Sequence, residues 1–173
     1  MADHYVDVVN EKDEVIGKEM KHKKPELGFI SRFVAVLIQD SAGRIIVCKR
    51  NPHKKFDPDK YDLTAFGSVD AGEDYSAAAA RELTEETGLS CPLTMLGKLY
   101  QENHHGDKTF RLFSGIFLGE TDADPQLSHE TVLFRRMTVA EIEKELAENP
   151  DAFCKGFRND FNFVKNKLAH EEK

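Results

Sequence analysis

Cysteine is scarce in this chain, and long hydrophobic runs and an excess of basic charge are missing altogether. The three cysteines, Cys48, Cys91 and Cys154, are odd in number, far apart and in no C-x-x-C arrangement. A disulfide framework or a zinc site is therefore not expected, and the pattern fits a reducing compartment. No apolar run approaches the length that a membrane-spanning helix needs. A net charge of -7 argues against a sequence-independent grip on DNA or RNA, which depends on a basic surface.

The 173 residues have the length of one domain with a single substantial core. We expect an N-terminal hairpin extension over residues 1–30, a core over 31–150 and a C-terminal helix over 151–173. The first residues lack the basic-then-apolar layout of a secretory signal, so a cytoplasmic location is expected. The oligomeric state stays open between a monomer and a homodimer.

Alternating or β-branched apolar runs bounded by turn residues predict most of the strands. A hairpin is predicted at 5–18 around the turn-like NEKDE, and a second one joins 33–38 to 45–49. Further strands are predicted at 63–69, 93–101, 109–118 and 131–137. The polar segment ENHHGDK, which contains His104 and His105, is predicted as the turn between two of them.

Two helices are predicted towards the end of the chain. Thr138, followed three residues later by Glu141, forms a capping-box signature for a helix that ends near Asn149. The last helix has apolar residues at i, i+4, i+4, i+3 and i+4 spacing, namely Phe153, Phe157, Phe161, Val164 and Leu168. A row of phenylalanines at this spacing predicts a core-facing stripe rather than a ligand groove.

The most informative stretch covers residues 67–89, where a glycine-bearing loop leads into an alanine-rich helix. This helix ends in Glu82, Glu85 and Glu86, whose carboxylates fall within an arc of roughly 100° on one face. Like charges at this spacing disfavour a bare helix by about 0.2–0.5 kcal/mol per pair, which a bound divalent cation would offset. Oxygen ligands without nearby Cys or His favour Mg²⁺, or Mn²⁺ in its place, over zinc. For Glu85 and Glu86 alone, an ordinary solvated charge run is the alternative.

The spacing of the whole stretch resembles the Nudix box, with every position filled. The match consists of Gly67, five residues, Glu73, seven residues, Arg81-Glu82-Leu83, one residue, Glu85-Glu86, one residue and Gly88-Leu89. The resemblance implies an α/β fold, the Nudix α/β/α sandwich with a mixed central sheet. It also implies a metal-dependent hydrolase that cleaves a diphosphate linked to another moiety, with water attacking phosphorus.

Roles within the box follow from the same resemblance. Glu82, Glu85 and Glu86 are expected to bind the metal, together with the backbone carbonyl of Gly67. Glu82 also stands where several family members place a water-activating base, whereas others recruit that base from outside the box. Arg81 is expected to pair with Glu73 and to hold the loop against the helix. Gly88 is predicted as the helix C-cap, where a left-handed backbone is wanted.

Outside the box, fewer residues point to chemistry. Glu130 is the best candidate for a further acidic group near the metal, with Glu102, Asp107 and Glu120 as rivals. A cationic loop that contains Arg50, Lys54 and Lys55 is the candidate for binding substrate phosphate, although solvated lysines are the ordinary alternative. The two histidines of ENHHGDK lack a third ligand nearby and are interpreted as turn residues.

Three motifs outside the box, DVVNEKDEVIGK, CKRNPHKK and HETVLFRRMTVAEI, resemble the Nudix branch that contains isopentenyl-diphosphate isomerase and its hydrolase-like relatives. The isomerase needs a cysteine on the strand before the box loop, where this chain has Ala65 and Phe66, and Cys48 lies on an earlier strand. Its His-Arg pair is Ser31-Arg32 here. The intact REL-EE pattern favours a hydrolase of a small nucleoside-diphosphate-type substrate. An isomerase-like enzyme and a non-catalytic nucleotide-binding module remain alternatives, because neither fold nor motif identifies the ligand.

Overall fold

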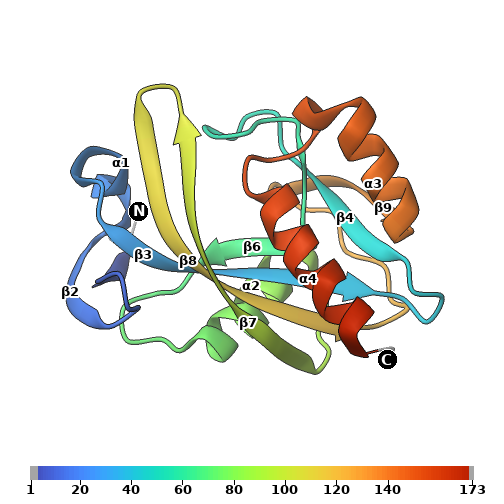
Figure 1. Cartoon of the computed structure of the whole chain (residues 1–173), viewed down its shortest axis with the longest axis horizontal. Coiled ribbons are helices and arrows are strands. Elements are labelled where there is room, and N and C mark those ends of the chain that lie inside the picture. The colour runs from blue at the N-terminus through green and yellow to red at the C-terminus, as the bar shows by residue number, and fades with distance from the viewer. Residues whose placement is uncertain (1–3, 172–173) are drawn as a thin grey trace.

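The computed structural model describes residues 4–171, and within them nine strands form one mixed sheet with helices on both faces (Figure 1). The strands are β1 (Tyr5–Val9), β2 (Val15–Met20), β3 (Ile30–Gln39), β4 (Ile45–Arg50), β5 (Tyr61–Asp62), β6 (Ala65–Ser68), β7 (Leu93–His105), β8 (Lys108–Glu120) and β9 (Thr131–Met137). The helices are α1 (Lys24–Leu27), α2 (Tyr75–Thr87), α3 (Val139–Glu148) and α4 (Phe157–Glu171), with short 3-10 turns at Lys21–Lys23 and Pro150–Ala152. Helix α2 covers one face and helices α3 and α4 the other, which confirms the predicted α/β/α sandwich.

Strand β3 is the centre of the sheet. It pairs antiparallel with β1 and β6 and parallel with β8 over nine residue pairs. Because it is covered on both sides, it is a nearly continuous apolar run: Val34, Val36 and Ile38 pack towards α2, whereas Ala35 and Leu37 pack towards α4.

The predicted hairpin of β3 and β4 is wrong beyond its turn. The two strands are paired only at Gln39 and Ile45, after which β4 leaves to pair with β9 and β5. The reason is that both edges of β3 are already occupied by β6 and β8. The predicted strand at 63–69 is present in part, as β6 at Ala65–Ser68, and the separate short strand β5 at Tyr61–Asp62 precedes it.

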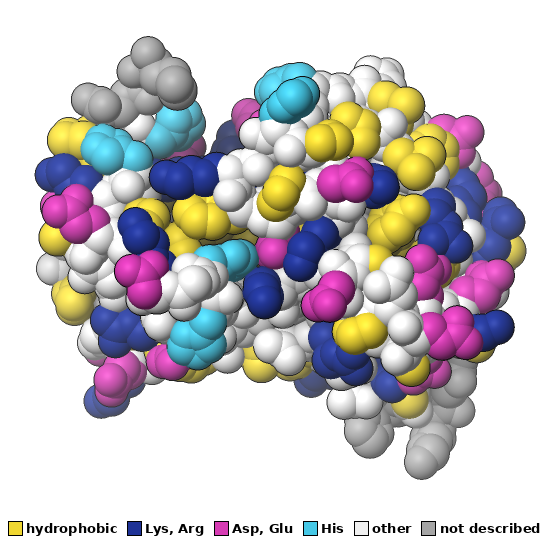
Figure 2. Space-filling model, turned by 90° about the horizontal axis from the view of Figure 1, so that it is seen from above, with side chains coloured by type: hydrophobic (Ala, Val, Ile, Leu, Met, Phe, Trp, Pro, Cys, Tyr) yellow, Lys and Arg dark blue, Asp and Glu magenta, His cyan; other side chains and the backbone are white. Residues whose placement is uncertain are grey.

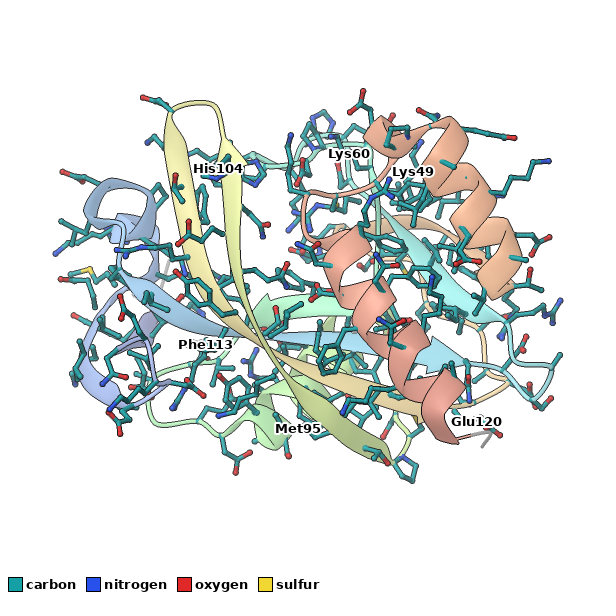
Figure 3. The ribbon with its side chains drawn as sticks, viewed as in Figure 1. Lys49, Lys60, Met95, His104, Phe113 and Glu120 are labelled. Carbon is teal, nitrogen blue, oxygen red and sulfur yellow. The ribbon has the colours of Figure 1, made fainter. Side chains whose placement is uncertain are left out.

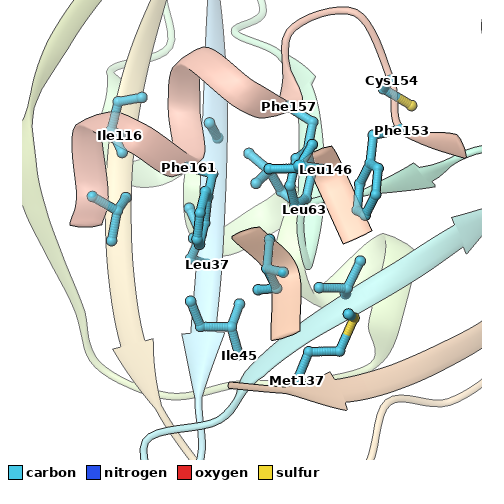
Figure 4. Packing of buried hydrophobic residues seen from close by; sticks show 14 residues of the cluster. Leu37, Ile45, Leu63, Ile116, Met137, Leu146, Phe153, Cys154, Phe157 and Phe161 are labelled. Atoms are coloured by element: carbon cyan, nitrogen blue, oxygen red, sulfur yellow. The ribbon is translucent and has the colours of Figure 1, made fainter. Parts of the chain in front are cut away.

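The phenylalanine stripe lies in the core, as predicted. Phe153, Phe157 and Phe161 are each at most 3% exposed and pack over Leu37 and Leu63, as Figure 4 shows. The helical boundary was wrong, since α4 begins at Phe157 and Phe153 is in extended backbone after a 3-10 turn. Residues 172–173 of the predicted helix lie outside the described part of the chain.

Local signals gave correct boundaries elsewhere. Thr138 and Glu141 form the expected capping box of α3. The N-terminal hairpin is present as β1 and β2.

The predicted turn at ENHHGDK is shorter than expected. His104 and His105 are not turn residues but the end of β7, and Gly106 with φ 65° begins the turn into β8. Across residues 4–171, no helix is long and apolar enough to cross a membrane.

Candidate active site at the end of helix α2

Gly67 and Glu82 are in direct contact, and this contact explains why the first box position is a glycine. Strand β6 brings Gly67 next to α2, and the Glu82 carboxylate occupies the space that a Cβ at position 67 would fill. Any side chain at position 67 would therefore displace this carboxylate. Gly88 closes the helix in the left-handed conformation, with φ 68°, as predicted.

Arg81 links the loop, the strand and the acidic end of α2. Its guanidinium donates to both carboxylate oxygens of Glu73, at 2.9 and 2.8 Å, and to the carbonyl of Ser68 at 3.0 Å. The same group donates to Glu82 at 2.8 Å and to Glu85 at 3.3 Å. The expected pairing of Arg81 with Glu73 is present, and Arg81 additionally neutralises part of the carboxylate cluster.

Glu86 points away from Arg81, into a small pocket between β6 and β4. Its carboxylate accepts a hydrogen bond of 3.2 Å from the backbone N–H of Phe66. Burial raises the pKa of Glu86 to about 8, and the negative charge of Glu82 adds to this effect. Burial also raises the pKa of Glu82, which the hydrogen bond and charge of Arg81 partly offset. The two carboxylates thus share a site with too little positive charge.

Glu130 reaches the same pocket from the loop before β9. The pairing of Arg50 with Thr131 places Glu130 beside Asn51, whose N–H donates to its carbonyl at 3.0 Å. Burial alone would raise the pKa of Glu130, but the hydrogen bond and charge of Lys54 outweigh it, so the pKa is lowered. Glu130 is therefore ionised at neutral pH.

Two of the three predicted cations belong to this site. Arg50 lines the pocket with Glu86 and Glu130 and donates to Asp62 and to the carbonyl of Phe56, both at 3.3 Å. Its buried Nε atom has no hydrogen-bond partner. Lys54 is paired with Glu130. The exposed Lys55, by contrast, lies with its ammonium over the Phe56 ring and is not brought to the carboxylates.

The rival acidic residues lie elsewhere. Glu102 accepts a hydrogen bond of 2.7 Å from the Tyr100 hydroxyl, and Asp107 is in the turn between β7 and β8. Glu120 ends β8 at the opposite end of the sheet from His104, as Figure 3 shows.

Pocket-lining residues that the sequence did not indicate are Cys48, Lys49, Asp62, Phe66 and Thr131. Cys48 and Arg50 are two residues apart on one strand and so share a face, which would have suggested that this cysteine lies near the site.

The donor set suits a hard divalent cation, because it consists of crowded carboxylates whose raised pKa values a bound cation would lower again. Within residues 4–171, no three His, Cys, Asp or Glu side chains are already gathered around one point. Arg81 donates hydrogen bonds to Glu82 and Glu85, so its guanidinium would compete with a cation for these two carboxylates.

Comparison with known proteins gives a consistent result. The NUDIX domain model matches residues 30–155. An uncharacterized Nudix hydrolase of Pseudomonas aeruginosa, PA4841, is 32% identical over 142 residues, which cover 82% of each protein. The crystal structure of DR0079 from Deinococcus radiodurans has the same fold, with a TM-score of 0.77 and 23% identity over 91% of this chain and 97% of its own. An Ap4A hydrolase of C. elegans, solved as a binary complex, has a TM-score of 0.58 and 19% identity over 80% of this chain and 98% of its own.

Proposed function

Because this chain belongs to the NUDIX domain family and is a hydrolase of phosphorus-containing acid anhydrides, we propose that it cleaves the diphosphate linkage of a small nucleoside-diphosphate-type substrate. The Ap4A hydrolase acts on a nucleotide, by its name, and its fold is shared by this chain. This likeness supports a nucleotide substrate.

Glu82, Glu85, Glu86 and the Gly67 carbonyl would hold a divalent cation, Mg²⁺ or Mn²⁺. The ion would supply positive charge for the diphosphate oxygens and for the attacking water. Arg50 would bind the phosphates, because a guanidinium presents several donors in a planar fork and the Nε of Arg50 lacks a partner.

The proton of the attacking water would pass to a carboxylate. Glu82 contacts Gly67 on β6, and Glu130 is ionised and lies in the same pocket as Glu86. Both are in reach of the site, and Glu130 has the lower pKa of the two. We favour Glu82 as a metal ligand, and it is also the first candidate for the base. Glu130 is the second candidate for the base, because Lys54 holds it in the ionised form.

The observation that carries this proposal is that Glu86, Glu130 and Arg50 line one pocket, although they come from a helix, a loop and a strand distant in the sequence. Charges that only stabilise the fold can pair within one element or between two. Here three separate elements bring opposite charges to one site, beside the contact of Glu82 with Gly67. Phosphate chemistry does need both: carboxylates for the cation and cations for the phosphate.

The test is release of phosphate or pyrophosphate from a substrate panel, with and without Mg²⁺. The panel holds nucleoside di- and triphosphates, nucleotide sugars, dinucleoside polyphosphates and isopentenyl diphosphate. Glu86→Gln removes the charge of one ligand at nearly constant size, and we expect a loss of at least about 10²-fold in kcat/KM. Glu148→Gln, on the exposed side of α3, is the control and should leave activity unchanged. Wild-type turnover in Glu86→Gln would overturn the proposal.

An isomerase-like activity on isopentenyl diphosphate is the second candidate, because Cys48 lies in the same pocket as Glu86. Burial raises the pKa of the Cys48 thiol, so it is protonated at neutral pH and is no thiolate nucleophile. Cys48→Ser should leave anhydride hydrolysis within a few-fold of wild type. Conversion of isopentenyl diphosphate to its isomer, lost in Cys48→Ser, would favour the isomerase instead.

A further inference from the structure

The guanidinium group of Arg50 is held at both of its terminal nitrogens. Nη1 donates to the carboxylate of Asp62 and Nη2 donates to the carbonyl of Phe56, each at 3.3 Å. The Nε atom is buried and has no hydrogen-bond partner in residues 4–171. The N–H groups of a guanidinium point in fixed directions within one plane. Anchoring the two terminal nitrogens therefore also fixes the direction of the Nε–H.

Asp62 is held in place by groups other than Arg50. Strand β5 pairs with β4 so that Asp62 lies opposite Cys48, and its side chain shares a face with Arg50, two residues further along β4. The Oδ1 atom of Asp62 accepts from the Leu63 N–H at 2.9 Å, whereas Oδ2 accepts from Arg50. Burial raises the pKa of Asp62, while the charge of Arg50 and the hydrogen bond from Leu63 favour its ionised form. Asp62 thus offers Arg50 a fixed acceptor.

Phe56, the second acceptor, is fixed as well. It belongs to the loop between β4 and β5, which reaches the β7–β8 hairpin (Figure 1). Its ring centroid is 5.4 Å from that of His105 and 5.0 Å from that of Phe110. The next residue, Asp57, accepts a hydrogen bond of 3.2 Å from the Lys155 N–H. The loop that supplies the carbonyl is therefore packed in two places.

Arg50 differs in this respect from the cations on the surface nearby. At the end of the molecule that carries the β7–β8 turn, Lys, Arg and His side chains lie around a hollow in the surface (Figure 2). Lys54 pairs with Glu130, whose side chain is 30% exposed, and Lys55 is exposed. The Asp62 side chain that holds Arg50 is only 13% exposed.

Stability alone explains the pair of Arg50 and Asp62 poorly. Burying two opposite charges costs desolvation that their attraction barely offsets, so such a pair is weak evidence for a stabilising role. Both residues line the pocket that holds Glu86 and Glu130. Buried polar groups are rarely left unpaired, so the free Nε of Arg50 in this pocket indicates an acceptor that a ligand supplies.

We propose that Asp62 is a positioning residue for the diphosphate: it holds the Arg50 guanidinium so that the Nε–H faces the pocket and donates to a phosphate oxygen of the substrate. This inference rests on the proposed hydrolase. It adds to that proposal an acidic residue that helps to bind an anion, and that acts through Arg50 rather than through the metal.

Charge alone predicts the opposite effect. Asp62 is an anion close to where the phosphates would lie, so loss of its charge should strengthen the binding of a polyanion by Coulomb attraction. Positioning predicts weaker binding, because the guanidinium is no longer held. Asp62→Asn separates the two, since it removes the charge at nearly constant size and its NH₂ group cannot accept from Arg50.

The probe is inorganic pyrophosphate with Mg²⁺, because it carries a diphosphate and no other substrate group. Its Kd is measured by calorimetry for wild type, Asp62→Asn, Arg50→Gln and the double variant. Asp62→Asn should weaken binding about fivefold to tenfold, and Arg50→Gln about tenfold or more, as loss of a charged hydrogen bond does. The double variant should bind within about twofold of Arg50→Gln, because Asp62 acts through Arg50 alone.

Asp59→Asn is the matched control. It removes the same charge from the same loop, at a side chain that is 58% exposed and pairs with Lys49. Its φ of 58° is one that asparagine adopts readily. Binding of pyrophosphate to Asp59→Asn should stay unchanged or become tighter. On a substrate that is hydrolysed, Asp62→Asn should raise KM more than it lowers kcat, because Arg50 binds the phosphates before and during the reaction.

A second measurement uses wild-type protein, so it does not depend on the folding of Asp62→Asn. The Nε–H signal of Arg50 in the ¹H–¹⁵N NMR spectrum, assigned by its absence in Arg50→Gln, should move downfield when pyrophosphate and Mg²⁺ are added. An Arg50 signal that stays in place while pyrophosphate binds, unchanged or tighter binding to folded Asp62→Asn, or a loss in the double variant equal to the product of the single losses would each overturn the proposal. These binding measurements need no turnover, and the hydrolase assignment is judged separately by metal-dependent product release and its loss in Glu86→Gln.

Discussion

Replacing Gly67 with alanine is expected to remove most of the activity and to leave the fold in place. An ideal Cβ at position 67 overlaps the Glu82 carboxylate. The overlapping atoms are the end of a flexible side chain and not backbone, so Glu82 can rotate away while strand β6 keeps its pairing with β3. The substitution therefore acts on the position of one carboxylate.

The expected energies follow from the contacts that change. Rotation of Glu82 breaks its 2.8 Å hydrogen bond from Arg81, and a hydrogen bond to a charged group contributes about 1.5–3 kcal/mol. Gly→Ala stabilises by about 0.4–1 kcal/mol through the unfolded chain, so the net loss in the free energy of unfolding is about 0.5–2.5 kcal/mol. A displacement of a catalytic group by about 1 Å can lower the rate about 10²-fold.

The assay measures kcat/KM on the substrate found in the panel, the Mg²⁺ concentration for half-maximal rate, and the urea midpoint. Gly17→Ala is the matched control, because Gly17 is on the edge strand β2 and an added Cβ there meets no atom within 4 Å. Gly67→Ala should lose about 10²-fold in kcat/KM and need more Mg²⁺, whereas Gly17→Ala should do neither. A Gly67→Ala protein with wild-type kcat/KM and Mg²⁺ dependence would refute the role of this contact.

Three further predictions concern charges. Asp160 is 1% exposed, and burial raises its pKa well above 3.8. The stability that its protonated form allows is therefore lost as pH rises through the folded-state pKa. In urea unfolding, Asp160→Asn should have the midpoint of wild type in acid and a higher midpoint than wild type at neutral pH. Asp13 is buried and anchors the N-terminal hairpin through partly buried ion pairs with Arg32 and Lys98, so Asp13→Ala should lower the free energy of unfolding by about 2–3 kcal/mol. Asp59→Ala, at an exposed pair, should leave thermal unfolding nearly unchanged. Lys54→Met should raise the pKa of Glu130 and, where this carboxylate is the base, move the acidic limb of the kcat/KM profile to higher pH.

Features that depend on short stretches of sequence were predicted well. The C-cap at Gly88, the capping box of Thr138 and Glu141 and the pairing of Arg81 with Glu73 all involve residues close in the chain. Their geometry follows from helical periodicity and from end groups that need hydrogen-bond partners.

Features that depend on strand pairing were not. Sequence spacing does not reveal that β4 leaves β3 after one residue pair, or that Cys48 therefore faces Glu86. The stacking of Phe33 on Phe66 is of the same kind, because it requires the register between β3 and β6. Glu130 was the exception: it was named from its place before a strand, and the pairing of β9 with β4 brings it to the pocket.

The divergence of β3 and β4 is also what makes room for the site. Strands β4 and β6 compete for one edge of β3, and β6 takes it over residues 33–36. Thr64 bridges the resulting gap, since its hydroxyl accepts from the Ile38 N–H at 2.9 Å and donates to the Ile46 carbonyl at 2.7 Å. Beyond this bridge the outer edge of β6 has no strand beside it among the described residues, so the Phe66 N–H is left for Glu86. A continuous β3–β4 ladder would have filled the edge of β3 that β6 occupies here. It would also have separated the carboxylates of α2 from the opposite face of the sheet.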